Sequence, residues 1–92
     1  MPLVLSVAPG QDFFVDDDRL VVGPILGKSR FEVTVEKTGV THQITDEEAA
    51  EVLPDVFLSA GRGPAASLAR VVVDAPQEII ILRGDKYREY GR

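Results

Sequence analysis

The chain has 92 residues, 45% of them hydrophobic, and this length and composition predict one small globular domain. It contains no cysteine and one histidine, His42, which excludes a disulfide framework, a sulfur-based zinc site and a multi-histidine metal site. No apolar run approaches the roughly 18 residues that span a bilayer, and the chain does not open with a signal-peptide pattern. We therefore expect a cytoplasmic protein with no membrane contact, no bound metal and no cofactor.

Charge is distributed unevenly along the chain. Residues 1–61 carry four basic and eleven acidic side chains, a net charge of −7, whereas residues 62–92 carry six basic and four acidic ones, a net charge of +2. Nucleic-acid binding usually requires a basic patch. The chain as a whole argues against such binding, while its last third permits it.

The first half of the chain alternates between short apolar runs and turn residues, which is typical of β-strands. Gly23 and Pro24 interrupt the third run, and because proline cannot donate to a strand ladder, this strand is predicted to lie on an edge or to carry a bulge. Phe31, Val33 and Val35 alternate with polar residues, which predicts an antiparallel strand with one buried face. The expected strands cover residues 3–7, 13–15, 20–26, 31–35 and 40–44.

The segment TDEEAAEVL, residues 45–53, predicts a helix. Thr45 is a favourable N-cap, Glu48 completes a capping box three residues later, and Pro54 would end the helix. Its acidic residues are therefore interpreted as helix-stabilising rather than as a catalytic pair. A brief strand over residues 55–61 and a flexible loop over 61–67 are expected to follow.

The two runs with the highest apolar content lie in the C-terminal part, at residues 71–73 and 79–82. They predict strands over 68–74 and 78–83, followed by a helix over 85–90. A strand that is apolar at nearly every position is covered on both faces. In so small a chain, we expect the second cover of residues 79–82 to be another subunit.

No catalytic constellation is visible in the sequence. There is no nucleophile–base signature and no metal-ligand cluster, and His42 stands alone in an expected turn or short strand. The three consecutive aspartates, Asp16–Asp18, are expected to form a solvated turn rather than a cation site, because no further oxygen ligands follow at a suitable spacing. We therefore expect no enzyme and no catalytic residues.

Both ends of the chain resemble one family, the carbon storage regulators (CsrA/RsmA) of bacteria. The stretch LVLSVAPGQDFFVDDDRLVV, residues 3–22, is similar to the family's opening strand, glycine turn, second strand and acidic turn. The stretch ARVVVDAPQEIIILRGDKYRE, residues 69–89, follows the family's order of APxE, apolar strand, arginine and, four residues on, tyrosine. Segments 1–27 and 69–92 are thus family-like, and residues 28–68, termed here the insertion, replace a short turn of the family.

The resemblance implies one domain over residues 1–92, mainly β with short helices. It implies an interlocked antiparallel β-sheet homodimer, elaborated by an inserted strand and helix. It also implies a post-transcriptional regulator of translation that binds GGA-containing loops of mRNA or small regulatory RNA. In the family, the first strand of one chain and the last strand of its partner together hold the RNA. By this likeness, the RNA-binding residues are Leu5, Ser6, Ile81, Leu82 and Arg83.

Departures from the family, at Val7, Ala8, Leu82 and Gly84, keep alternatives open. Val7 and Ala8 stand where the family usually has basic residues, so binding is expected to be weaker and less dependent on salt. The alternative function is a dimeric scaffold that has lost RNA binding and contacts a protein through the insertion.

Arg83 has its own alternative, an ion pair with Asp85, Glu89 or a partner-chain acid. Tyr87 and Tyr90 could stack on bases, or Tyr87 could pack a terminal helix onto the domain.

Overall fold

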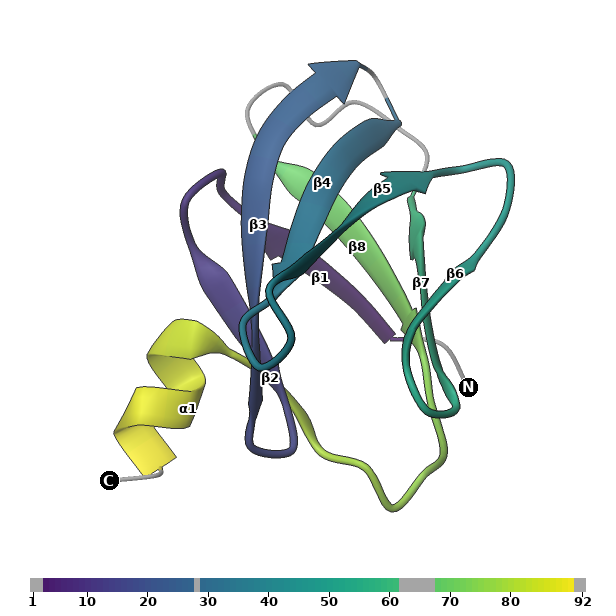
Figure 1. The fold of residues 1–92 in the computed structure, drawn as a ribbon. Helices are drawn as coiled ribbons and strands as arrows, with labels where there is room; N and C mark the ends of the chain where they lie inside the picture. The colour runs from purple at the N-terminus through teal and green to yellow at the C-terminus, as the bar shows by residue number, and fades with distance from the viewer. Residues whose placement is uncertain (1–2, 28, 62–67, 91–92) are drawn as a thin grey trace.

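The structure is a computed structural model that describes residues 3–27, 29–61 and 68–90, apart from the side chain of Tyr90. In these ranges the chain forms two antiparallel β-sheets and one short helix, and β3 and β4 cross in front of β1 and β8 in Figure 1. The predicted mainly-β fold is therefore confirmed. The elements are β1 Leu3–Val7, β2 Asp12–Val15, β3 Asp18–Gly27, β4 Arg30–Val35, β5 Val40–Thr45, β6 Ala50–Leu53, β7 Val56–Ala60, β8 Ala69–Asp74, β9 Ile81–Arg83 and α1 Gly84–Tyr90.

The order of the strands shows what the insertion contributes. One sheet has the order β1-β8-β7-β6, and the other has the order β5-β4-β3-β2-β9. The four strands β4 to β7 all belong to the insertion, and they join β3 of the first family-like segment to β8 of the second. The insertion is therefore folded, as expected, and it extends both sheets between the two family-like segments.

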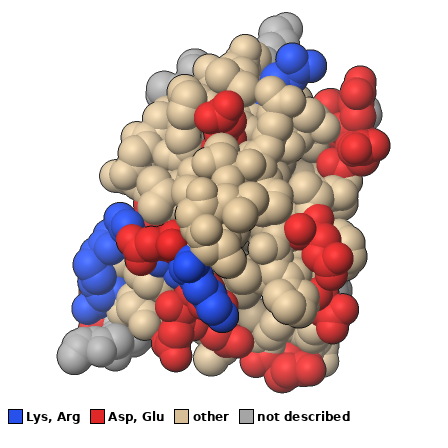
Figure 2. Space-filling model, in the orientation of Figure 1, with Lys and Arg blue, Asp and Glu red and all other residues tan. Residues whose placement is uncertain are grey.

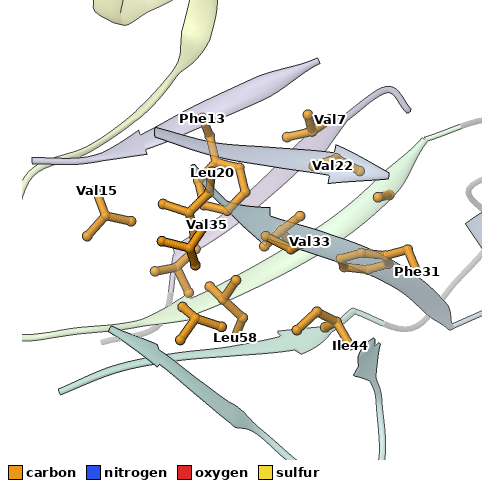
Figure 3. Close-up of a cluster of buried hydrophobic side chains, with 14 of the residues drawn as sticks. Val7, Phe13, Val15, Leu20, Val22, Phe31, Val33, Val35, Ile44 and Leu58 are labelled. Carbon is orange, nitrogen blue, oxygen red and sulfur yellow. The ribbon is translucent and has the colours of Figure 1, made fainter. Parts of the chain in front are cut away.

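The two sheets enclose one hydrophobic core. Both family-like segments and the insertion supply side chains to it. Figure 3 shows Phe13 and Leu20 of the first family-like segment together with Val33, Ile44 and Leu58 of the insertion. These five side chains are almost completely buried. The predicted alternation of β4 is confirmed, because its odd-numbered residues are buried and its even-numbered ones are not. One chain thus builds a core of its own from all three segments.

The irregularity predicted at Gly23 and Pro24 is also confirmed. The pairing of β3 with β4 shifts register between Val22 and Ile25, which places a β-bulge at the Gly–Pro step. Proline has no amide hydrogen to donate, so a bulge accommodates it without leaving a gap in a regular ladder.

The helix predicted over residues 45–53 is wrong. Thr45 ends β5, residues 46–48 form a bend, and Ala50–Leu53 form strand β6 paired with β7. The Thr45 hydroxyl accepts a hydrogen bond from the amide of Glu47 over 3.4 Å, which makes a local turn rather than a helix cap. A nine-residue helix is marginal alone, whereas strand pairing buries Val52 in the core. Tertiary packing therefore overrides the local capping signal.

The last strand is shorter and more exposed than predicted. Only Ile81–Arg83 pair with β2, and Ile80 is 62% exposed in the chain. The run 79–82 is therefore not covered on both faces within one chain. Hydrogen bonds to Asp16, in the turn after β2, explain where the strand begins. The Asp16 carboxylate accepts a hydrogen bond from the Ile80 amide, and the Asp16 amide donates one to the Ile80 carbonyl. The loop predicted over 61–67 falls largely outside the described residues.

Candidate functional site

One cavity of the described chain lies where β1 ends and α1 begins. It has a volume of about 420 Å³, and Val7 at the end of β1 faces it together with Arg83 at the end of β9. Two further arginines, Arg19 and Arg88, also line it. We call this cavity the arginine cleft. Its remaining lining residues are Gly10, Gln11, Asp12 and Asp85.

A second cavity shows how β1 and β9 run relative to each other. It has a volume of about 230 Å³, and it is lined by Leu3 at the start of β1 and by Ile79 and Ile81 around the start of β9, among others. The start of β1 is thus near the start of β9, and the end of β1 is near the end of β9. The two strands are edges of different sheets. They therefore run in parallel orientation with one cavity at each end, and we call these two strand edges together with the two cavities the edge slot.

A buried carboxylate organises the arginine cleft. The side chain of Asp12 is 4% exposed and receives three hydrogen bonds. Arg19 Nε donates to Asp12 Oδ2 over 2.6 Å, and Arg88 donates through Nη1 and Nη2 to Oδ2 and Oδ1 over 3.1 and 3.2 Å. Arg19 Nη1 donates in turn to Glu36 over 2.7 Å. This network neutralises Arg19 and Arg88 and attaches α1 to the five-stranded sheet.

The network makes a prediction about acid stability. The two hydrogen bonds from Arg88, together with the one from Arg19, hold the pKa of Asp12 below its ordinary 3.8 despite burial. A carboxyl with a depressed folded-state pKa stabilises the fold above its unfolded value and loses that contribution as the pH falls through the folded value. We expect Asp12→Asn to be less stable than wild type at neutral pH by about 1–3 kcal/mol.

Urea titrations at neutral pH and at successively lower pH values would measure this difference. The gap between Asp12→Asn and wild type should shrink as the pH falls below 3.8, the ordinary value. A gap that stays constant with pH would contradict a structural role for the Asp12 charge.

An aromatic stack also holds α1 in place. The rings of Tyr87 and Phe14 lie 3.7 Å apart between centroids and are inclined by 8°. The Tyr87 hydroxyl donates to Asp17 over 3.1 Å, which raises the pKa of Tyr87. Tyr87 thus packs the terminal helix onto β2, the structural one of the two interpretations. The Tyr90 side chain lies outside the described part of the structure.

The residues predicted for RNA binding do not form one contiguous surface within the chain. Leu5 and Ile81 are half-buried and pack against the core, whereas Ser6 is exposed on the opposite face of β1. Leu82 is half-buried and pairs with Phe14. The structure instead brings the ends of the two predicted strands together, with Arg83 at the cleft that Val7 also lines.

Arg83 is the arginine of the cleft with the weakest acidic contact. Its side chain is 46% exposed, and its Nε lies 3.7 Å from Asp85 Oδ1, which is longer than a hydrogen bond. Of the three acidic partners predicted for Arg83, the one in contact is Asp85. Since a surface pair at this distance contributes little, the guanidinium remains available to a ligand.

Gln11, Asp12 and Arg19 of the cleft were not predicted from the sequence, and neither was the ion pair between Asp12 and Arg88. Arg19, Asp12 and Gln11 come from the first family-like segment, and Arg88 lies 76 positions after Asp12. The only local sequence signal for these residues is Asp12, a charged residue at the start of the apolar run DFFV. Nothing in the sequence indicates which residues pair with it. Within the described ranges, no group of His, Asp or Glu is arranged to hold a metal ion.

Most of the visible surface is uncharged, and away from α1 its charged side chains are mainly acidic. Figure 2 shows them along the right side and the lower edge of the molecule, while basic ones gather at the lower left, where Figure 1 places α1. No helix in the described ranges is long and apolar enough to cross a bilayer.

Comparison with known proteins finds no matching family model, curated protein or solved structure.

Proposed function

We propose that the chain is an RNA-binding, post-transcriptional regulator of translation. It recognises GGA-containing loops of mRNA or small regulatory RNA, as the resemblance to carbon storage regulators implies, and it acts as a homodimer. The observation that supports this most is the edge slot. The two strands expected to hold RNA border it in parallel, and Arg83 stands at its end.

The chemistry of the slot suits a single-stranded loop. Edge strands carry backbone N–H and C=O groups that are not used by a neighbouring strand, and β1 and β9 each present one such edge. These groups can bond to the edges of unpaired bases, which is how RNA loops are generally read. An arginine fork adds a two-pronged contact to guanine or phosphate. In this arrangement each chain supplies both strands of its own site.

The proposal predicts a specific effect of Arg83→Ala. Because the guanidinium would make a paired contact, its removal should weaken RNA binding by about 1–3 kcal/mol, a roughly ten- to hundredfold rise in Kd. Fluorescence anisotropy with a hairpin that displays GGA in its loop would measure this, beside a loop-scrambled hairpin. Arg30→Ala is the matched control, since Arg30 is an exposed arginine at the start of β4.

Two results of that titration would contradict the proposal. One is an unchanged affinity of Arg83→Ala at low salt, and the other is equal affinity for the GGA and scrambled loops. A similar loss in Arg30→Ala would indicate general charge attraction rather than a site.

The charge distribution supports a second candidate, a protein-binding module built on the same scaffold. Two of the three arginines of the cleft are neutralised by Asp12 and Glu36, and the chain has a net charge of −5. A surface of this kind suits a basic protein partner better than a polyanion. A well-folded protein that binds no RNA at low salt would favour this function.

A further inference from the structure

Arg83 shares the arginine cleft with a carboxylate, Asp85, which follows it closely in the chain. Both residues line the cavity, and their side chains are 46% and 67% exposed. Arg83 Nε and Asp85 Oδ1 lie 3.7 Å apart, which is longer than a hydrogen bond. The N–H groups of Arg83 and the oxygens of Asp85 are therefore available to a ligand side by side.

The remaining charges of the cleft are paired with one another. Asp12 accepts hydrogen bonds from both other arginines of the cleft, and Glu36 accepts one from Arg19. Together with Arg83 and Asp85, three basic and three acidic side chains meet at this site, so it has no excess of positive charge. A phosphate would be repelled by the carboxylates. The cleft suits a neutral ligand that offers both acceptors and donors.

Among the RNA bases, guanine offers this combination on adjoining edges. Its O6 and N7 atoms accept hydrogen bonds, and its N1–H and N2 amino groups donate them beside O6. Adenine has an amino group in place of O6, so it would direct a donor at Arg83, which is itself only a donor. The cavity of about 420 Å³ also lies within the range of about 300–1,000 Å³ that is typical of small-molecule sites.

We propose that the arginine cleft recognises one guanine of the RNA loop, with Arg83 donating to O6 and N7 and Asp85 accepting from N1 and the N2 amino group. This inference rests on the proposed function and names the base bound at that end of the edge slot. Hydrogen bonds to Asp12 hold the guanidinium groups of Arg19 and Arg88 in place, and unpaired RNA bases stack on such planes. The Asp12 network thus positions the base, while Arg83 and Asp85 identify it.

The direction of the effect of Asp85→Ala separates base recognition from charge attraction. If the cleft only attracted phosphates, removing an acid would strengthen RNA binding. Because Asp85 instead accepts from guanine, its removal should weaken binding of the GGA hairpin about tenfold. Glu89→Ala is the matched control, since Glu89 is an acid of the same helix, is 63% exposed and pairs with Lys86 rather than lining the cleft. It should not weaken binding.

Modified bases test the two contacts atom by atom. Inosine lacks the N2 amino group of guanine, and 7-deazaguanine lacks N7. At the recognised guanine, each substitution should weaken binding to wild type about tenfold. Inosine should cost little in Asp85→Ala, and 7-deazaguanine should cost little in Arg83→Ala, because the contact concerned is already absent. Fluorescence anisotropy would measure these affinities with hairpins in which each guanine of GGA is replaced in turn.

A structural role of Asp85 would give a different result. Asp85 lies in the first turn of α1, so a variant that only displaced the helix would bind every hairpin more weakly and leave the cost of inosine unchanged. Either that result or tighter binding by Asp85→Ala would overturn the guanine assignment, while a preference for GGA over the scrambled loop would preserve the proposed function. A wild type that binds no GGA hairpin would overturn both.

Discussion

Leu58→Ala should lower the free energy of unfolding by about 2–5 kcal/mol, although Leu58 lies in the insertion. Its side chain is fully buried on β7 and packs in the same core as Leu20 and Val22 of the first family-like segment. Removing it leaves a cavity between the two sheets, because neighbouring strands cannot close onto the space. A loss of this size is a large fraction of the stability of a domain of 92 residues.

Urea denaturation followed by circular dichroism would measure this loss. Wild type and Leu58→Ala should each unfold in one cooperative transition, since the insertion and the family-like segments share one core. Leu26→Ala is the matched control, because Leu26 is 46% exposed on β3 and its truncation should change stability by less than about 0.5 kcal/mol. Two separate transitions would show that the insertion folds as an independent unit.

Gly84→Ala is expected to have the second largest effect, about 1–3 kcal/mol of destabilisation. Gly84 is the first residue of α1, and it is buried against the Asp12 network. A Cβ added there would overlap Asp12 Oδ1 and would lie 2.7 Å from Asp12 Cγ and 2.8 Å from Arg88 Nη2. Asp12 cannot move away freely, because both of its oxygens are held by arginines. The helix would have to shift and weaken its ion pairs.

A double-mutant cycle would isolate this mechanism. In an Asp12→Ala background the obstructing carboxylate is absent, so Gly84→Ala should cost much less than in wild type. Gly27→Ala is the control, since its added Cβ would meet nothing closer than 3.9 Å. Additive effects of the Asp12 and Gly84 substitutions would contradict the proposed overlap.

The strands were predicted well where local patterns and core burial agree. The alternation of Phe31, Val33 and Val35 correctly predicted a half-buried strand, and the Gly23–Pro24 step correctly predicted a bulge. The helix over 45–53 was mispredicted because its signal was purely local. The capping pattern at Thr45 competes with pairing to β7, and burial of Val52 in the shared core decides the outcome.

The candidate site was predicted less completely. Arg83 was identified through the resemblance, and its contact with Asp85 was among the expected alternatives. The roles of Asp12 and Arg88 were not anticipated, because 76 positions separate them and no periodic pattern connects residues at that distance. The structural role of Tyr87 likewise depends on Phe14. The two rings stack because α1 packs onto β2, which the sequence does not indicate.

Local patterns were enough to predict the mainly-β class, the positions of most strands and the short terminal helix, because alternation, turn residues and apolar runs are local properties of the chain. The order of the strands, the role of the insertion and the parallel edges of β1 and β9 became visible with the folded chain. These features depend on contacts between distant residues. Burial and charge pairing select such contacts for the folded chain as a whole, so no short window of sequence contains them.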